Sequence, residues 1–266
     1  MTTPGPLADL ERYYDTAPRA SCDTEEIGPL TLFVARNGFP YYARPRLGLD
    51  GGVTAADVTS VLERQRELGV PRAVEWVRDT TPSLLAAARA AGMTVEECPL
   101  LVLEQEPPEA DPTAGVRIVS ADDPELGLVR AAVNVGFGTP GTGLGEASVA
   151  ERDADATAHP ETAVRIAALI ATGLGILAGA FDPEAGPVGG GSHNPRGEVS
   201  EIVGVGVLPA YRRRGLAAAI TAVLARHALD HGVHTVFCSA QDDAVARVYE
   251  SVGFRRVGIA CVAEAG

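Results

Sequence analysis

The sequence predicts a protein of the mixed α/β (α+β) class that is built from two related lobes. The first observation is a succession of helix, strand, helix and strand, which occurs over 55–103 and again over 216–263. The second is a weak self-similarity in register, because Val61-Leu-x-Arg64 precedes one Gly-Val pair and Val223-Leu-x-Arg226 precedes another. We therefore expect one unit that occurs twice.

An acidic, proline-rich stretch separates the two copies. Residues 104–115 contain three prolines and four acidic residues, a composition typical of a linker. We expect an N-terminal lobe at 1–105, a linker at 106–115 and a second lobe at 116–266.

Apolar periodicity and flanking Gly and Pro residues predict the elements of each lobe. In the first lobe we expect strands over 30–35 and 41–44, a helix over 55–68, a strand over 73–77, a helix over 82–91 and a strand over 94–103. In the second we expect a strand over 116–119, helices over 122–135 and 146–158, strands over 164–170, 174–181 and 198–207, a helix over 216–230, a strand over 235–239, a helix over 243–252 and a strand over 255–263. The glycine-rich 136–145 and the Pro/Gly-rich insert 182–196 are expected to be loops.

Composition limits the classes of partner. The net charge of −13 and pI near 4.8 argue against nucleic acid and mildly favour a cationic acceptor. The uncharged stretch 166–181 is shorter than the roughly 20 residues of a membrane helix, and the start of the chain lacks a signal-peptide pattern. Four cysteines without metal-ligand spacing fit a reducing cytoplasm, and 22 arginines without a single lysine indicate a GC-rich bacterial genome.

The most informative segment is 203–220, in which an apolar strand leads through Arg212-Arg-Arg-Gly215 into a helix. Backbone N–H groups of such a turn, together with the positive end of the helix dipole, form a site for a phosphate or pyrophosphate. Gly215 allows the backbone to approach the anion closely.

The pattern Arg212-x-x-Gly215-x-Ala217 resembles the acyl-CoA pyrophosphate loop of the GNAT superfamily of N-acetyltransferases. Tyr249-x-x-x-Gly-Phe follows, with the tyrosine 37 positions after Arg212, a spacing similar to that of the superfamily. The resemblance implies two GNAT-like lobes, each with a mixed, mostly antiparallel sheet flanked by helices. The first lobe lacks the arginine-glycine turn and has Ala88 in place of Tyr249, so we expect it to be degenerate.

The resemblance also implies an acetyl-CoA site in the second lobe. Backbone groups of the turn would hold the pyrophosphate, while the main chain of the preceding strand would pair with pantetheine. The residues assigned to this site are Val205, Gly206, Val207, Arg212, Arg213, Arg214, Gly215, Leu216, Ala217, Ala218 and Asp242. The side chains of Val203, Val205 and Val207 are alternatively core residues, a role that is compatible with backbone pairing to the cofactor, and Asp242 is alternatively an ordinary helix N-cap.

Acyl transfer to an amine requires a base, a group that stabilises the oxyanion, and an acid for the leaving thiolate. The resemblance makes Tyr249 the general acid, with a buried structural tyrosine as the alternative. Glu201 lies 11 positions before Arg212, where some superfamily members carry a basic glutamate, and the N–H of Val205 is a candidate for the oxyanion. His193 is the alternative base, although it is expected in an exposed loop.

The predicted function is transfer of acetyl from acetyl-CoA to a primary amine of a small molecule by direct attack, in the cytoplasm and without a metal. Three alternatives remain: another acyl-CoA donor, a protein acceptor, or a non-catalytic acyl-CoA sensor. The quaternary state is expected to be a monomer or a homodimer.

Overall fold

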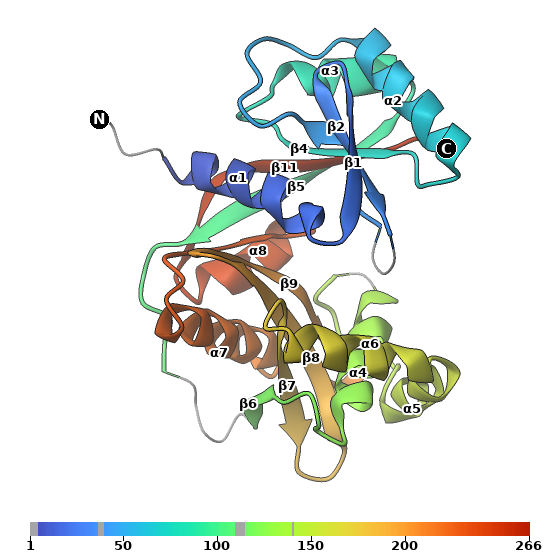
Figure 1. Cartoon of the computed structure of the whole chain (residues 1–266). Coiled ribbons are helices and arrows are strands. Elements are labelled where there is room, and N and C mark those ends of the chain that lie inside the picture. The colour runs from blue at the N-terminus through green and yellow to red at the C-terminus, as the bar shows by residue number, and fades with distance from the viewer. Residues whose placement is uncertain (1–4, 37–39, 110–114, 140) are drawn as a thin grey trace. The chain divides into compact units, whose positions relative to one another are not determined.

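The chain folds into two compact units in the computed structural model, which describes residues 5–36, 40–109, 115–139 and 141–266 (Figure 1). One unit comprises Met1–Leu100 together with Val257–Gly266, and the other comprises Leu101–Arg256. The last ten residues therefore group with the first unit, whereas the sequence placed all of 116–266 in the second lobe. The expected linker, 106–115, lies only partly within the described residues.

The predicted αβαβ succession is present in the first unit. Its elements are α1 (Pro6–Arg19), β1 (Cys22–Ile27), β2 (Leu30–Ala35), β3 (Arg44–Pro45), α2 (Ala55–Leu68), β4 (Ala73–Val77), α3 (Ser83–Ala90) and β5 (Thr94–Leu103). Four of these, namely β2, α2, β4 and β5, have the predicted bounds. The sequence made no prediction for α1 and β1, and it placed the short strand β3 at 41–44.

Two sheets organise the first unit. Strands β1, β2 and β3 form one antiparallel sheet, and β4 pairs antiparallel with β11 (Phe254–Glu264), which is followed in the strand order by β5. The buried core beside these strands contains Trp76, Leu30 and Leu84, together with apolar residues of α2. Burial of these large side chains is the main favourable contribution to the stability of this unit.

The second unit begins with one strand and three helices and continues with a meander of three strands. Its elements are β6 (Val116–Val119), α4 (Leu126–Phe137), α5 (Val149–Ala158), α6 (Pro160–Ala171), β7 (Ile176–Asp182), β8 (Gly186–Arg196), β9 (Val199–Val207), α7 (Leu216–Asp230), β10 (Thr235–Ser239) and α8 (Asp243–Glu250). Strands β6 to β9 pair antiparallel in chain order, and β10 pairs parallel with β9.

The strand predicted over 164–170 is wrong, because this segment belongs to helix α6. Pro160 occupies the first turn, where its missing N–H costs nothing. Ala163, Ile166, Ala167 and Ile170 follow helical spacing and pack on a core cluster that contains Val129. The sequence reasoning took an uncharged run for two strands, although the period of its large residues was helical.

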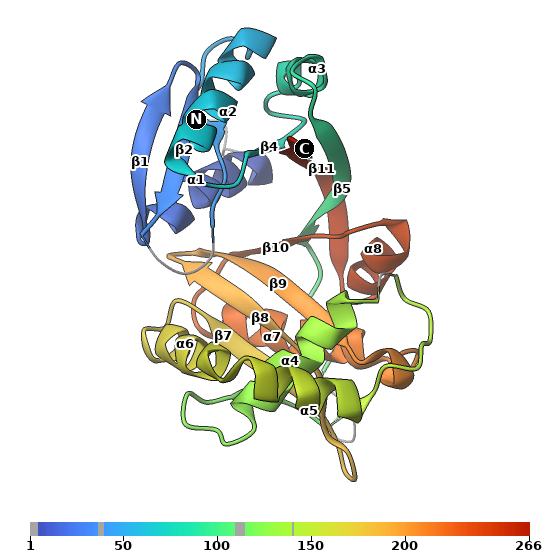
Figure 2. The same ribbon diagram turned by 90° about the vertical axis from the view of Figure 1, so that its right-hand side faces the viewer.

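The loop predicted over 182–196 is also wrong, because residues 186–196 form strand β8. Its glycines make room for helices on both faces of the sheet. A Cβ on Gly190 would lie 2.7 Å from a Val129 methyl group of α4, and one on Gly191 would lie 3.1 Å from Ile220 of α7. Figure 2 shows α4 and α7 on opposite sides of β8 and β9. Glycine here is a packing requirement and not a turn signal.

None of the helices within the described residues is long and apolar enough to cross a membrane.

Candidate functional site

Strand β9 separates from its parallel neighbour part-way along its length. The register with β10 joins Val199 to Thr235 and ends at Glu201 and Phe237, whereas β9 continues to Val207. The two strands therefore diverge beyond Glu201, which leaves backbone of β9 without the parallel pairing that its first residues have. An extended ligand can pair with a strand in such a place.

A bulge lies in this diverging part of β9. The pairing with β8 shifts between Gly190 and Ser192, and Gly204 on the opposite strand has a φ of 63°. A left-handed residue within a bulged strand favours glycine and redirects the backbone groups that follow. The next glycine, Gly206, has a different role, since a Cβ there would lie 3.0 Å from the carbonyl oxygen of Val133 in α4. Its bare face is filled by a helix of the protein itself.

The turn after β9 contains two left-handed residues. A short 3₁₀ turn, Pro209–Tyr211, leads to Arg213 with a φ of 63° and Gly215 with a φ of 78°. Arg213 has the one positive φ of a non-glycine residue in the described chain. Such a conformation costs roughly 1–2 kcal/mol outside glycine, so strain is concentrated in this turn.

The strained turn exposes a row of backbone donors. The N–H groups of residues 213–218 form no hydrogen bond with any described residue, and α7 has no side-chain cap at Gly215. A Cβ on Gly215 would meet no atom within 4 Å, so the space beside the turn is open. Six unpaired donors at the positive end of a helix are suited to an anion with several oxygens, such as a pyrophosphate. The predicted cofactor segment therefore has backbone donors that suit a pyrophosphate group.

The three arginines of the turn differ in what their side chains do. Arg212 does not face an anion: its guanidinium donates to the carbonyl oxygens of Val207, Gly136, Thr139 and Gly143 at 2.7–3.3 Å. Burial lowers its pKa. Arg214 stacks over the Tyr211 ring at 4.8 Å and lies 3.5 Å from Asp182.

Arg212 thus attaches the glycine-rich segment 136–145 to the turn, a structural role that the sequence analysis did not assign. Arg213 and Arg214 are exposed and supply the positive charge beside the donors.

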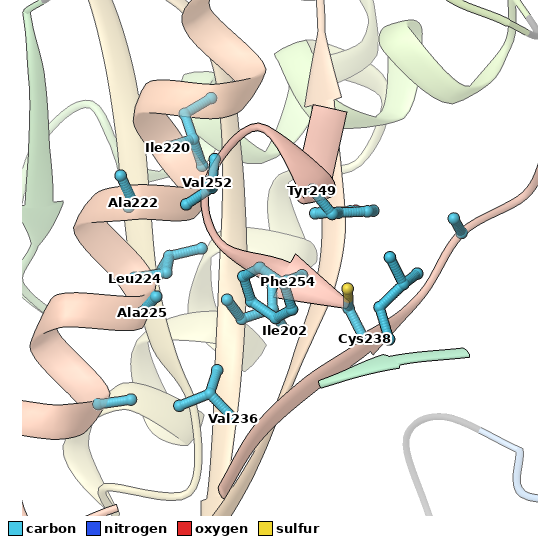
Figure 3. Close-up of a cluster of buried hydrophobic side chains, with 14 of the residues drawn as sticks. Ile202, Ile220, Ala222, Leu224, Ala225, Val236, Cys238, Tyr249, Val252 and Phe254 are labelled. Carbon is cyan, nitrogen blue, oxygen red and sulfur yellow. The ribbon is translucent and has the colours of Figure 1, made fainter. Parts of the chain in front are cut away.

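Tyr249 lies in the core next to the diverging strands. Its side chain is 6% exposed, and its ring packs against Phe254 with 5.9 Å between centroids (Figure 3). No described residue forms a hydrogen bond with its hydroxyl, which is nevertheless not among the fully buried unpaired atoms. Burial, and secondarily Cys238, raises the pKa of Tyr249. The hydroxyl therefore keeps its proton at neutral pH while retaining contact with solvent.

Cys238 connects the two predicted catalytic residues. Burial, and secondarily the charge of Glu201, raises the pKa of this thiol, which in turn acts on Tyr249. Glu201 is half-buried on β9 and lies opposite Phe237 in the register, where the strands begin to diverge. The structure thus brings Glu201, Cys238 and Tyr249 to one region of the second unit.

Two further residues lie differently from what the sequence indicated. His193 is 1% exposed within β8 and is not in an exposed loop. It contacts Ser200 at 2.9 Å and His227 at 3.0 Å, and burial with two neighbouring histidines lowers its pKa to about 3. A group with these contacts is a poor general base. Asp242 accepts a hydrogen bond from the N–H of Val245 at 2.8 Å, which makes it the N-cap of α8.

Arg130 is the single charged residue of helix α4 and was not among the residues predicted from the sequence. Its guanidinium lies beside the bulge, 3.7 Å from the position of a Cβ on Gly204. A lone charge in an otherwise apolar helix was the available signal.

Comparisons with known proteins agree with this geometry. Residues 148–254 match the sequence model of the Acetyltransferase (GNAT) family. No curated protein sequence matches the chain. Among solved structures, a GCN5-related N-acetyltransferase from Kribbella flavida is 21% identical, with a TM-score of 0.69, and the match covers 99% of this chain and 97% of that one.

Two other structures are similar over most of the chain. A putative GNAT acetyltransferase from Novosphingobium aromaticivorans is 18% identical with a TM-score of 0.56, and the match covers 98% of this chain and 99% of that one. A tandem GNAT protein from the clavulanic acid biosynthesis pathway is 17% identical with a TM-score of 0.52, covering 89% and 78%. At these identities the structures show the fold, with its two lobes, while the family model covers the turn and Tyr249. Residues 148–254 of the second unit are therefore similar in sequence to the GNAT acetyltransferase family, and the chain shares the fold of these structures.

Proposed function

We propose that the second unit binds acetyl-CoA and transfers its acetyl group to a primary amine of a small molecule. The observation that carries this proposal is the row of six unpaired N–H groups at the start of α7, directly after a strand that diverges from its neighbour. Residues 213–218 would hold the pyrophosphate, and the backbone of Val205 and Val207 would pair with the pantetheine arm. Acetyl-CoA would supply a thioester that is activated toward nitrogen nucleophiles.

The residues around the divergence supply the proton transfers. Glu201 removes a proton from the acceptor ammonium, so that the neutral amine nitrogen can bond to the acyl carbon. As the carbon–sulfur bond then breaks, the nitrogen releases its second proton to the tyrosinate that Tyr249 becomes when it protonates the sulfur, and Glu201 returns its proton to solvent. The N–H of Val205, next to the bulge, stabilises the charge on the acyl oxygen. Tyr249 donates its proton to the departing sulfur, since its raised pKa keeps the hydroxyl protonated at neutral pH. The four free cysteines support a reducing, cytoplasmic setting.

The test combines acetyl-CoA binding by calorimetry with release of free CoA over a panel of primary amines. Tyr249→Phe is expected to lower kcat about 100-fold while the dissociation constant of acetyl-CoA and the Tm stay near their wild-type values. The ring and its packing remain in this variant, so a structural role alone would leave kcat unchanged. Equal loss of binding and turnover would assign Tyr249 to the fold. Binding of acetyl-CoA without turnover of any amine would favour the sensor alternative.

A further inference from the structure

Arg130 is a partly buried cation without a partner. Its side chain lies on α4 over the face of β9 that carries the bulge, with Nη1 at 3.7 Å from the position of a Cβ on Gly204. No residue of the described chain forms a hydrogen bond or an ion pair with it. Burial of an uncompensated guanidinium is unfavourable, and such groups are normally paired.

The other partly or fully buried arginines of the second unit follow this rule. Arg152 donates to the carbonyl oxygens of Ala185 and Pro187, and Arg196 to that of Leu174. Arg212 and Arg226 also donate to backbone carbonyls. Among the described buried or half-buried arginines of this unit, Arg130 alone lacks such an acceptor.

The charges around Arg130 increase its need for an anion. Burial, and secondarily the positive charge of Arg165 on α6, lowers its pKa, while Asp155 on α5 acts in the opposite direction. Asp155 forms no ion pair with Arg130; its carboxylate accepts from the side-chain amide of Asn134 at 3.0 Å and lies 3.5 Å from His159 Nδ1. The carboxylate that acts on Arg130 is thus engaged with other groups.

We propose that Arg130 binds a carboxylate of a substrate whose reacting atoms lie at the Gly204 bulge. This inference rests on the proposed function, since the bulge is the place where that function puts acyl transfer. The carboxylate belongs either to the amine acceptor, which is then a zwitterion such as an amino acid, or to a dicarboxylic acyl chain on CoA. Both sources present the same planar group, which a guanidinium binds with two parallel hydrogen bonds.

The proposal changes what the overall charge suggests about the acceptor. A net charge of −13 favours cations near the surface as a whole, whereas Arg130 favours an anion beside the Gly204 bulge. A molecule with an amine and a carboxylate has both the positive charge that the surface favours and the negative charge that Arg130 favours. Its amine would face Glu201 and its carboxylate would face Arg130.

The experiment uses pairs of substrates that differ only in charge. Acceptors are a set of α-amino acids and their α-amides with acetyl-CoA as donor, and donors are succinyl-CoA and butyryl-CoA with the amide acceptors. In the wild type, the charged member of one pair is expected to have the higher kcat/KM. Arg130→Gln should lower kcat/KM for that member about 10- to 100-fold and leave the neutral member within about threefold. Arg130→Lys should restore part of the loss, because it keeps the charge but not the paired geometry.

The neutral substrate is the internal control for folding, and thermal unfolding of each variant is measured alongside. If the amino acids are preferred over their amides, the carboxylate that Arg130 binds belongs to the amine acceptor. If succinyl-CoA is preferred over butyryl-CoA, that carboxylate belongs to the acyl chain. The inference is overturned if neither charged member is preferred, or if Arg130→Gln lowers both members alike. Absence of acetyl-CoA binding by the wild-type protein is a separate result, which would contradict the proposed function itself.

Discussion

Helices α2 and α7 occupy equivalent positions in the repeated αβαβ succession, but their first turns differ in chemistry. In α2 the turn is closed by its own residues: the N–H of Asp57 donates to Thr54 Oγ1 at 3.3 Å, and the N–H of Thr54 donates to the Asp57 carboxylate at 2.9 Å. In α7 the cap is Gly215, which has no side chain to offer, and the N–H groups stay unpaired.

The difference is the reason why we propose a binding site at the start of α7 and only a structural role for the start of α2. The hydrogen bonds from Thr54 lower the pKa of Asp57, so a fixed negative charge already lies at the positive end of α2. An incoming phosphate would meet like charge and occupied donors there. The proposed site on α7 should therefore depend as much on the absence of an acidic cap as on the arginines beside it.

The largest predicted effect comes from transferring the acidic cap of α2 to α7. Asp57 is the third residue of its helix, and Ala218 is the equivalent residue of α7. Ala218→Asp would place a carboxylate about 4 Å from a bound phosphate, a repulsion of about 4 kcal/mol at an effective dielectric constant near 20. The dissociation constant of acetyl-CoA, measured by calorimetry at low salt, should rise about 1,000-fold.

Ala218→Asn is the matched control, because it has the same shape without the charge. It is expected to weaken binding about tenfold or less. Equal weakening by the two variants would mean that the side-chain volume at this position matters and the charge does not. That result would contradict the explanation given for the difference between α2 and α7.

A somewhat smaller effect is expected when the open cap itself is filled. Gly215→Val puts a branched side chain into the space beside the donors and strains a residue with a φ of 78°. Loss of two charge-assisted hydrogen bonds would weaken acetyl-CoA binding about 100-fold. Gly232→Val is the control: it lies just after the other end of α7, has a φ of 83° and also meets no atom within 4 Å. The Tm of this variant should fall because of the strain, and its affinity for acetyl-CoA should not change.

Much of the fold could be predicted because strong local patterns determine it. Helices α2 and α7 and strands β4, β5 and β10 have the predicted bounds, since each combines clear periodicity with glycine or polar flanks. Strand β8 could not be predicted, because Gly190 and Gly191 fit two helices that come from distant parts of the sequence. Glycine without knowledge of those partners indicates a loop.

In the candidate site too, features that depend on neighbouring residues could be predicted, and features that depend on contacts between distant segments could not. The turn with Gly215 could be predicted because a basic, glycine-containing segment between an apolar strand and a helix is a local pattern. The four carbonyl oxygens that engage Arg212 could not, since three of them belong to 136–145. His193 was placed in a loop because the contacts that bury it come from Ser200 and His227, on other elements.

Acid should act on one unit more than on the other, because all five histidines lie in 101–256. The pKa of His193 is lowered to about 3, below the 6.5 of an unfolded chain, so the unfolded state binds the proton more tightly. The stabilisation is complete above about pH 6.5 and is lost as the pH falls toward 3. Between pH 7 and pH 5 the free energy of unfolding of the second unit should fall by about 2 kcal/mol from this group.

The measurement is urea unfolding of wild type and His193→Asn at the two pH values. Asparagine can still hydrogen-bond with Ser200 but does not titrate, so the acid-dependent loss should shrink in the variant by about 2 kcal/mol. Carboxylates contribute equally to both proteins and cancel in the difference. An unchanged pH dependence would mean that the pKa of His193 is the same in the folded and unfolded states.

The smallest predicted effect concerns the capped first turn of α2. Thr54→Ala removes one hydrogen bond to the first turn of α2 and the hydroxyl that donates to Asp57 at 2.6 Å, which should cost about 1 kcal/mol in the free energy of unfolding. Thr59→Ala is the control on the same helix, where the hydroxyl bonds to the Ala55 carbonyl within the helix and alanine has the higher helix propensity. Acetyl-CoA affinity should not change in either variant. If the first unit of Thr54→Ala gained phosphate or CoA binding, the Thr54 cap alone would be what prevents α2 from binding an anion. If the variant lost stability without gaining such binding, the remaining charge of Asp57 would be sufficient to prevent it.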